Sequence, residues 1–347
     1  MKLSVLSLAC IATLAAASSS YASGLRPGSE TVTAPTGKGT SEQRAPTTDI
    51  EAMEARLNAL TGGASVGGGT NTTQDNNGNG KGNGELFDSP GGQAGGGSHH
   101  SSGISYHGGP VMLGTNTVYF IWYGNWSGNS ATSILPNLIS GENGSPYFNI
   151  NTTFYNGSGT HVSNALTMGT TTTDSYSQGT SLSDAQIQSV VSSAISSGRL
   201  PSNTSAVYMV LTSSDVTASS GFCTQYCGWH THGTIGGADI KYAFIGNPDR
   251  CPSACEAQTT GPNGNAGADG MASIIAHELE EAVTDPDLNA WYDRQGAENA
   301  DKCAWTFGTE STAGNGSKYN VTFANGYKFL IQQNWPATNT GCTMSYP

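Results

Sequence analysis

A histidine and two glutamates at helical spacing are the residues best suited to chemistry in this sequence. The segment His277-Glu278-Leu279-Glu280-Glu281 lies in a stretch whose apolar residues repeat at helical intervals. Residues four apart project from one face of a helix, so His277 and Glu281 could bind one cation. Glu278 is turned by about 100° from His277, which puts a carboxylate beside the metal as general base for water. The spacing predicts a zinc-dependent hydrolase of the metallopeptidase kind, with a peptide or protein substrate.

The third ligand is expected from the segment after this helix. Glu298 and Asp301 are three residues apart, so we predict Glu298 as the ligand and Asp301 as the side chain that orients a ligand. His230, in the sequence GWHTHG, is the alternative ligand because imidazole is a good nitrogen donor. The non-functional alternative is that His277 is a helix histidine hydrogen-bonded to a carboxylate, with solvated glutamates around it.

A series of oxygen side chains follows the helix and suggests calcium as a second cofactor. The series is Asp285, Asp287, Asn289 and Asp293, and Asp285 is also an alternative ligand of the helix site. An EF-hand loop needs glycine at position six and glutamate at position twelve, where this sequence has Ala290 and Gly296. We therefore favour a helix end at Thr284-Asp285-Pro286 followed by a polar loop.

The elements expected around this site belong to one α/β (α+β) domain. Apolar, β-branched runs predict strands within 111–126, 206–214 and 235–247, and Asn325-Gly326 predicts a hairpin turn. A capping box at Ser183 begins one helix, which Gly198 closes, and Asp269 is expected to begin the helix of the site. A mixed sheet packed with helices in two or three layers, with a zincin-like active helix, is the predicted fold.

The N-terminal third has a different composition. Residues 1–22 have the charge, apolar run and small-residue end of a signal peptide, which predicts a secreted protein, or a periplasmic one in a bacterium. A lipoprotein with Cys10 as the lipidated residue is the weaker alternative. Residues 23–105 form a Gly/Asn/Ser-rich arm or propeptide, with one short helix expected near 47–62 as a docking segment, a propeptide element or a fraying helix. The folded domain is assigned to residues 106–347.

Six cysteines remain after the signal peptide, an even number that favours disulfides in an exported chain. We favour the local pairs Cys223 with Cys227 and Cys251 with Cys255, which leaves Cys303 with Cys342. The alternative is a zinc knot of the first four. The formal net charge of −12 excludes a typical nucleic-acid-binding surface, and no later apolar run reaches membrane-spanning length. We expect a monomer.

Several motifs in a common order resemble the EXORDIUM or phosphate-induced protein 1 family, as a microbial member. They are GGPVMLGTNTVYFIWYGNW, FCTQYCGWH, CPSAC, DGMASIIAHELEEAVTDPDLNAWY and ENADKC. The resemblance spans about Gly108 to Cys342, and the N-terminal arm lies outside it. It implies an extracellular protein associated with cell-wall growth signalling in plants, and it implies no reaction. The resemblance matches a family histidine to His230, the family pattern H-E-x-x-E to His277–Glu281, and the family pattern E-x-x-D-x-C to Glu298–Cys303.

The resemblance favours a second hypothesis, a non-catalytic extracellular protein that binds cell-wall carbohydrate or a receptor. Trp126, Trp229 and Trp335 are candidates for stacking on sugars, or for the core. A Glu278→Gln substitution separates the two hypotheses, because only a hydrolase would lose turnover while it keeps its metal.

Overall fold

The computed structural model describes residues 103–294 and 296–347. The predicted signal peptide, the helix near 47–62 and nearly all of the arm lie outside these residues. Ile104 is buried, and β1 (Ser105–Tyr106) pairs antiparallel with β10 (Trp291–Tyr292). The packed chain therefore includes the last residues of the segment assigned to the arm.

The centre of the fold is a mixed sheet, as predicted, and it has six strands. Its order is β3-β2-β6-β9-β8, with β4 beside β2 as well. The strands β2 (Asn116–Tyr123), β6 (Ala206–Thr212) and β9 (Ala238–Ile245) are parallel, as are β3 (Leu166–Met168) and β4 (Thr172–Asp174) to β2. Every residue of β6 is buried, which explains its continuous apolar sequence, because parallel strands are covered on both faces.

The edge strand β8 (Gly228–Ile235) is antiparallel to β9 and was not predicted. Its sequence, GWHTHGTI, has neither an apolar run nor an alternation of apolar and polar residues. The strand forms because Gly236 and Gly237, both with positive φ, make a two-residue hairpin turn into β9. This strand brings His230 into the fold.

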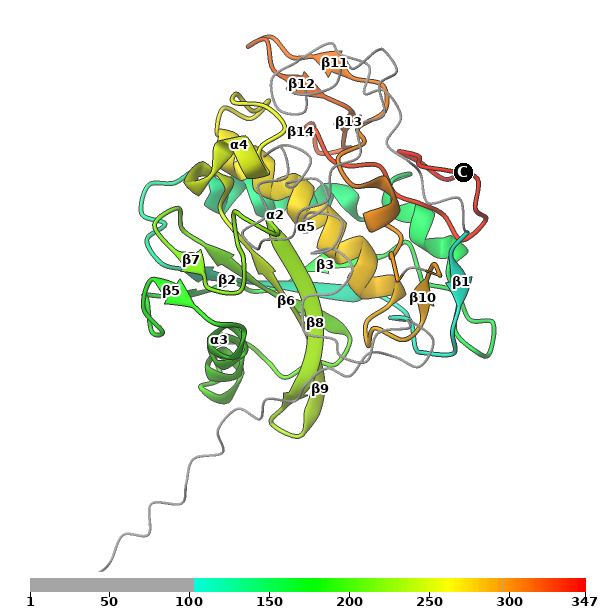
Figure 1. The fold of residues 1–347 in the computed structure, drawn as a ribbon, viewed down its shortest axis with the longest axis horizontal. Coiled ribbons are helices and arrows are strands. Elements are labelled where there is room, and N and C mark those ends of the chain that lie inside the picture. The colour runs from blue at the N-terminus through cyan, green and yellow to red at the C-terminus, as the bar shows by residue number, and fades with distance from the viewer. Residues whose placement is uncertain (1–102, 295) are drawn as a thin grey trace, which may run out of the picture.

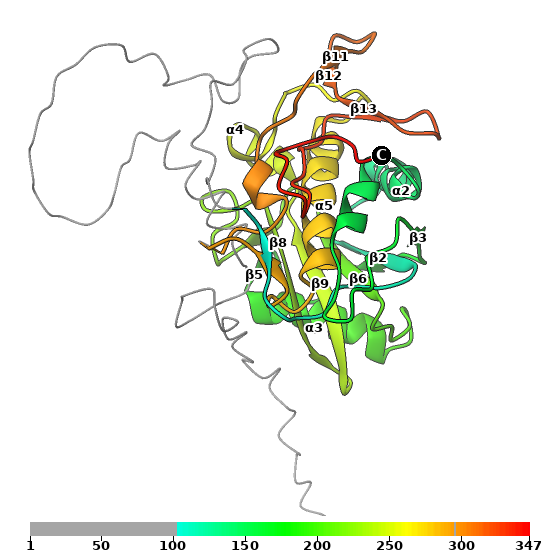
Figure 2. The same cartoon turned by 90° about the vertical axis from the view of Figure 1, so that its right-hand side faces the viewer.

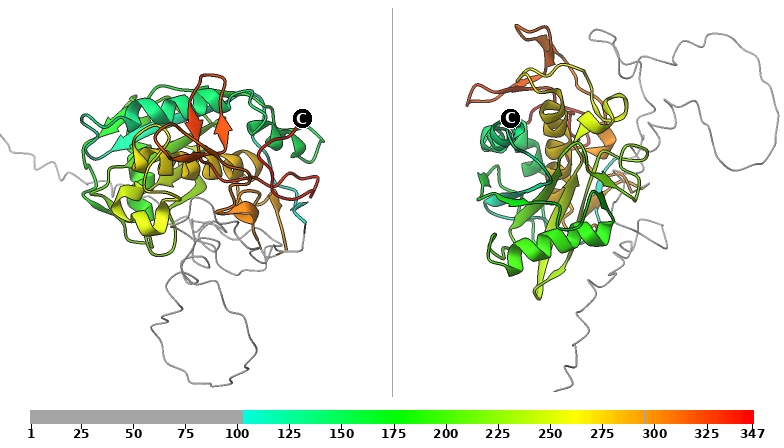
Figure 3. Two further views of the ribbon diagram at one scale, coloured as in Figure 1. Left: turned by 90° about the horizontal axis from the view of Figure 1, so that it is seen from above. Right: turned by 90° about the vertical axis from the view of Figure 1, so that its left-hand side faces the viewer.

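Helices cover both faces of the sheet, which makes three layers. Figures 1 and 3 show α2 (Ala131–Glu142) and α5 (Ala266–Thr284) beside each other on one face and α3 (Asp184–Ser196) on the other. The view in Figure 2 shows α5 running along the strands. The sequence did not predict α2, which contains Pro136. No helix among residues 103–294 and 296–347 has the length and apolar character to cross a bilayer.

The two predicted helix starts are borne out to different degrees. Ser183 accepts a hydrogen bond from the Gln186 N–H in a complete capping box, as predicted for α3. The predicted start of α5 was wrong by four residues: Asn265, not Asp269, is the N-cap and accepts from the Ala268 N–H, while Asp269 binds Asn263. The end of α5 at Thr284 agrees with the prediction.

Short elements complete the domain. The predicted hairpin pairs β13 (Val321–Thr322) with β14 (Lys328–Phe329), and Gly326 has positive φ in its turn. The other short elements are β5 (Ser181–Leu182) with β7 (Thr217–Ala218), β11 (Ser311–Thr312) with β12 (Lys318–Tyr319), η1 (Phe148–Thr153), η2 (Pro248–Arg250), α4 (Pro252–Cys255) and η3 (Asp301–Cys303).

The disulfide pairing corrects the sequence prediction. Cys223 bonds Cys251 and Cys227 bonds Cys255, with Cα–Cα distances of 5.8 and 5.7 Å, so the local pairs and the zinc knot are wrong. The reason is the β8–β9 hairpin, which aligns Gly228 with Ile245 and thus brings the segment before β8 next to the segment after β9. The predicted bond between Cys303 and Cys342 is confirmed.

Candidate metal centre

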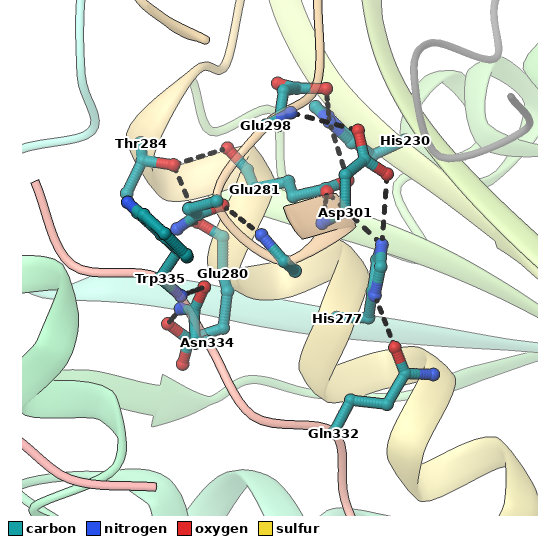
Figure 4. A network of polar contacts seen from close by, with 12 residues as sticks. His230, His277, Glu280, Glu281, Thr284, Glu298, Asp301, Gln332, Asn334 and Trp335 are labelled. Carbon is teal, nitrogen blue, oxygen red and sulfur yellow. Dashed lines mark hydrogen bonds and ion pairs between the residues drawn. The ribbon is translucent and has the colours of Figure 1, made fainter. Parts of the chain in front are cut away.

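Donor side chains from three parts of the fold converge beside α5. His277 and Glu281 come from the helix, His230 from β8, and Glu298 and Asp301 from the loop that runs into η3 (Figure 4). All five side chains have 0 % exposure. The site therefore lies inside the domain, between a helix, a sheet edge and a loop.

His277 forms one half of the cluster. Its Nε2 lies 3.2 Å from Glu281 Oε1 and 3.6 Å from Asp301 Oδ1. Its Nδ1 lies 3.0 Å from Gln332 Oε1, a contact in which the imidazole donates its Nδ1 proton to the amide oxygen. That bond selects the tautomer in which the Nε2 lone pair faces the carboxylates, as a metal-binding histidine requires.

His230 forms the other half. Its Nε2 lies 3.3 Å from Glu298 Oε2 and 3.6 Å from Glu281 Oε2. Glu281 thus directs one carboxylate oxygen toward each histidine. His230 stands two residues from Gly228 on the same face of β8, so the strand and α5 together fix its distance from Glu281.

Backbone hydrogen bonds hold the acidic loop against the helix. The Asp301 N–H donates to Glu281 Oε1 and the Glu298 N–H donates to Asp301 Oδ2, each at 3.0 Å. Asp301 therefore orients the loop and also directs an oxygen to His277, and its predicted role as the side chain that orients a ligand stays a prediction. The structure places Glu298 with His230 and Asp301 with His277, whereas the sequence grouped Glu298 with His277.

Burial disfavours the ionised form of the carboxyl groups in this cluster. The pKa of Glu281 is raised well above its usual value, first by desolvation and then by the nearby Asp301 carboxylate, while His277 acts in the opposite direction. Three buried carboxylates beside two imidazoles need compensation by protons or by a cation. The donor set of imidazole nitrogens and carboxylate oxygens suits zinc.

Glu278 lies next to the cluster, not within it. The carboxylate is buried against the start of β8, since a Cβ on Gly228 would come within 2.9 Å of Glu278 Oε1. The predicted general base thus follows His277 directly on α5 but belongs to neither His230's nor His277's group of donors.

The aspartates proposed for calcium have separate partners. Asp285 caps the end of α5 and accepts from the Asn289 and Ala290 N–H groups at 2.5 and 2.6 Å. Lys302 lies 2.9 Å from Asp293, and Lys241 lies 2.9 Å from Asp287. The polar loop favoured by the sequence is what forms, and calcium binding there stays a prediction.

A third acidic group on β8 and β9 is an ion-pair cluster. His232 Nδ1 lies 2.9 Å from Asp239 Oδ1 and 3.7 Å from Asp287 Oδ1. The ammonium of Lys241 contacts both aspartates, so it supplies the positive charge that a metal would otherwise provide. The pKa of Asp239 is lowered: burial raises it, but the contacts with Lys241 and His232 outweigh burial.

A buried acidic pair on the other side of α5 was not predicted from the sequence. Glu280 and Glu142, from α5 and α2, are both fully buried, and Glu280 accepts from Asn334 Nδ2. Burial raises the pKa of Glu142 to about 8. Because α2 was not predicted, no sequence signal paired these two residues.

The tryptophans proposed for sugar binding differ in exposure. Trp126 and Trp229 are buried, so the core alternative holds for them. Trp335 is partly exposed, donates to Asn339 Oδ1 and stacks under the Lys302 ammonium.

Comparison with known proteins gives the family. The family model "Phosphate-induced protein 1 conserved region" matches residues 104–345. The chain is 33 % identical to Protein EXORDIUM-like 3 of Arabidopsis thaliana, over 71 % of this chain and 84 % of that protein. It is 31 % identical to Protein EXORDIUM-like 5 of the same plant, over 71 % and 79 %, and 26 % identical to Protein PHOSPHATE-INDUCED 1 of Nicotiana tabacum, over 70 % and 88 %.

No solved structure matches significantly, so the zincin-like character of α5 stays a prediction. These relatives are plant proteins, and a microbial origin of the chain also stays a prediction. The family match covers nearly all of the described domain, including all six disulfide cysteines and the five donors around α5. The resemblance seen in the sequence is thereby confirmed, and this chain belongs to the phosphate-induced protein 1, or EXORDIUM, family.

Proposed function

We propose that this protein is an exported, non-catalytic member of the family. We also propose that its domain is held together by a zinc-binding centre formed by His230, His277, Glu281, Glu298 and Asp301. The observation that carries the proposal is the complete burial of all five donors where α5, β8 and the loop before η3 meet. A metal there would tie together segments far apart in the sequence.

The donor geometry supports zinc binding. In a tetrahedral site with bonds of about 2.0 to 2.2 Å, neighbouring donors lie roughly 3.3 to 3.6 Å apart. The contacts of His277 with Glu281 and of His230 with Glu298, at 3.2 and 3.3 Å, are close to this range. The bond from His277 to Gln332 supplies the orientation that metal-binding histidines usually receive from a neighbour.

Burial favours a structural role over a catalytic one. A catalytic zinc keeps one coordination position open to water and substrate, whereas a structural zinc is enclosed by protein ligands. The donors here are enclosed, and the names of the plant relatives mention no reaction.

Export is supported by the three disulfides, which are typical of oxidising compartments. A signal peptide at residues 1–22 stays a prediction. The partner is proposed to be a receptor or cell-wall carbohydrate, and Trp335 is the one of the three proposed tryptophans that is not buried.

Metal removal tests the structural role. We expect chelator treatment to lower the thermal midpoint of unfolding by about 10 °C. A ligand present at one thousand times its Kd adds about 4 kcal/mol to the free energy of unfolding, and each kcal/mol shifts the midpoint of a domain of this size by about 2 to 4 °C. Added zinc should restore the midpoint. The His277→Ala/Glu281→Ala variant should be insensitive to chelator, while His232→Ala, a control on β8, should respond like the wild type. A wild-type midpoint that chelator leaves unchanged contradicts the proposal.

A secreted zinc hydrolase, most simply a peptidase, is the second candidate. One observation favours it: the Glu278 carboxylate follows His277 on α5, at the position of a general base. If this candidate is correct, the wild type hydrolyses peptides, whereas the Glu278→Gln variant keeps its metal and has no hydrolytic activity. Equal, background hydrolysis by both proteins excludes it.

A further inference from the structure

We infer that the centre beside α5 holds two divalent metal ions bridged by Glu281. The inference rests on the proposed function, since it sets the number and arrangement of ions in the same centre. It names Glu281 as the shared ligand and gives each ion one histidine and one further carboxylate.

The donors separate into two groups that share a single residue. One group is His230, Glu281 and Glu298, and the other is His277, Glu281 and Asp301; within each group the ligand atoms lie within 4.8 Å of one another. Among the described residues, no such group contains both histidines. One ion at ordinary bond lengths would therefore bind only part of the cluster.

Glu281 has the geometry of a bridging carboxylate. Its Oε1 lies 3.2 Å from His277 Nε2, and its Oε2 lies 3.6 Å from His230 Nε2. A carboxylate that gives one oxygen to each ion holds the two ions about 3.5 to 4 Å apart, the usual spacing in two-metal sites. The Asp301 N–H fixes the position of Oε1.

Charge is compatible with this arrangement but does not determine the number of ions. With neutral imidazoles the three carboxylates carry three negative charges, which one divalent ion reduces to one and two ions convert to a single positive charge. The buried Glu278 carboxylate next to the cluster could balance that remaining charge. The division of donors into two groups is what favours two ions.

The test is the metal content of the untagged, folded protein, never exposed to chelator, by elemental analysis. We expect two divalent ions per wild-type chain, one in His230→Ala, one in His277→Ala and none in Glu281→Ala. His232→Ala, the matched control on β8, should keep two. Circular dichroism checks that each variant is folded.

A second readout does not depend on the variants. Wild-type protein reloaded with Mn²⁺ should give the exchange-coupled electron paramagnetic resonance spectrum of a bridged pair. One ion per chain with an isolated Mn²⁺ spectrum overturns the bridged pair and leaves the proposed metal centre intact. Two ions that both histidine variants retain overturn the pair as well. Absence of bound metal overturns the proposed function itself.

Discussion

Glu278, Glu280 and Glu281 are close in the sequence, and each faces a different part of the fold. Glu278 lies against the start of β8, Glu280 accepts from Asn334, and Glu281 contacts both histidines. Successive helix positions are turned by about 100°, so one buried helix can direct carboxylates to three surroundings. The spacing predicted the nearness of His277 and Glu281, but whether the other two are solvated depends on what packs on α5.

The buried Glu142 predicts a pH-dependent stability. Neither of its carboxylate oxygens has a hydrogen-bond partner among the described residues, and burial raises its pKa from 4.5 to about 8. The unfolded chain loses this proton near pH 4.5 and the folded chain near pH 8, so the folded state holds more protons between these values. As the pH rises from 4.5 to 8, Glu142 should therefore lower the free energy of unfolding by a growing amount. Above pH 8 the reduction should stay constant.

Glu142→Gln removes this titration. We expect the variant to be more stable than the wild type by roughly a few kcal/mol at pH 8.5, and by much less at pH 5, as a raised carboxyl pKa requires. Urea unfolding at both values measures the difference, and Glu310→Gln at an exposed site is the control. A difference that is the same at both pH values contradicts this prediction.

The strand β8 is the element that completes the centre, and sequence analysis did not identify it. Its glycines, histidines and threonines give no period-two pattern, and it is a strand because β9 pairs with it across the Gly236-Gly237 turn. The apolar runs of β2, β6 and β9 could be predicted because those strands are buried on both faces. His230 could be nominated as a ligand by residue type, but its distance from α5 could not.

The close packing between α5 and β8 leads to a prediction about a substitution in the strand. A Cβ on Gly228 would lie 2.4 Å from Ile274 Cγ2 and 2.9 Å from Glu278 Oε1. Gly228→Ala should therefore push α5 from the strand and cost about 1 to 3 kcal/mol, the usual range for overpacking. It should also weaken metal retention, because His230 and Glu281 would separate.

Gly233→Ala, on the same strand, is the matched control. Its added Cβ would lie 2.6 Å from the flexible end of Gln188 and at an ordinary contact distance of 3.6 Å from Tyr242 Cε1, so stability should change by less than about 0.5 kcal/mol. Chemical unfolding of both variants provides the measurement. Equal stability of the two contradicts the packing argument.

Across the whole molecule, long-range pairing determines both the disulfides and the centre. The local cysteine pairs were a reasonable prediction from spacing, but the β8–β9 hairpin brings Cys223 to Cys251 and Cys227 to Cys255. The five donor side chains of the centre likewise come from positions 230 to 301. The sequence predicted which residue types matter, and the chain topology decides which of them meet.

Peptide mapping tests the crossed disulfides. Trypsin cleaves after Arg199, Lys241, Arg250 and Arg294, so residues 200–241 and 251–294 each carry two of these cysteines. After denaturation without reduction, we expect these two peptides to remain linked and to separate only when reduced. Two separate peptides, each with an internal disulfide, would support the local pairs and contradict the crossed arrangement.

Zinc binding by the centre beside α5 is tested most directly by X-ray absorption at the zinc edge of the purified protein. We predict bound zinc with nitrogen and oxygen donors at about 2.0 to 2.2 Å and no sulfur shell near 2.3 Å. The signal should be lost in the His277→Ala/Glu281→Ala variant. Absence of zinc from the wild type, or a sulfur shell that would place the metal at the cysteines, contradicts the account.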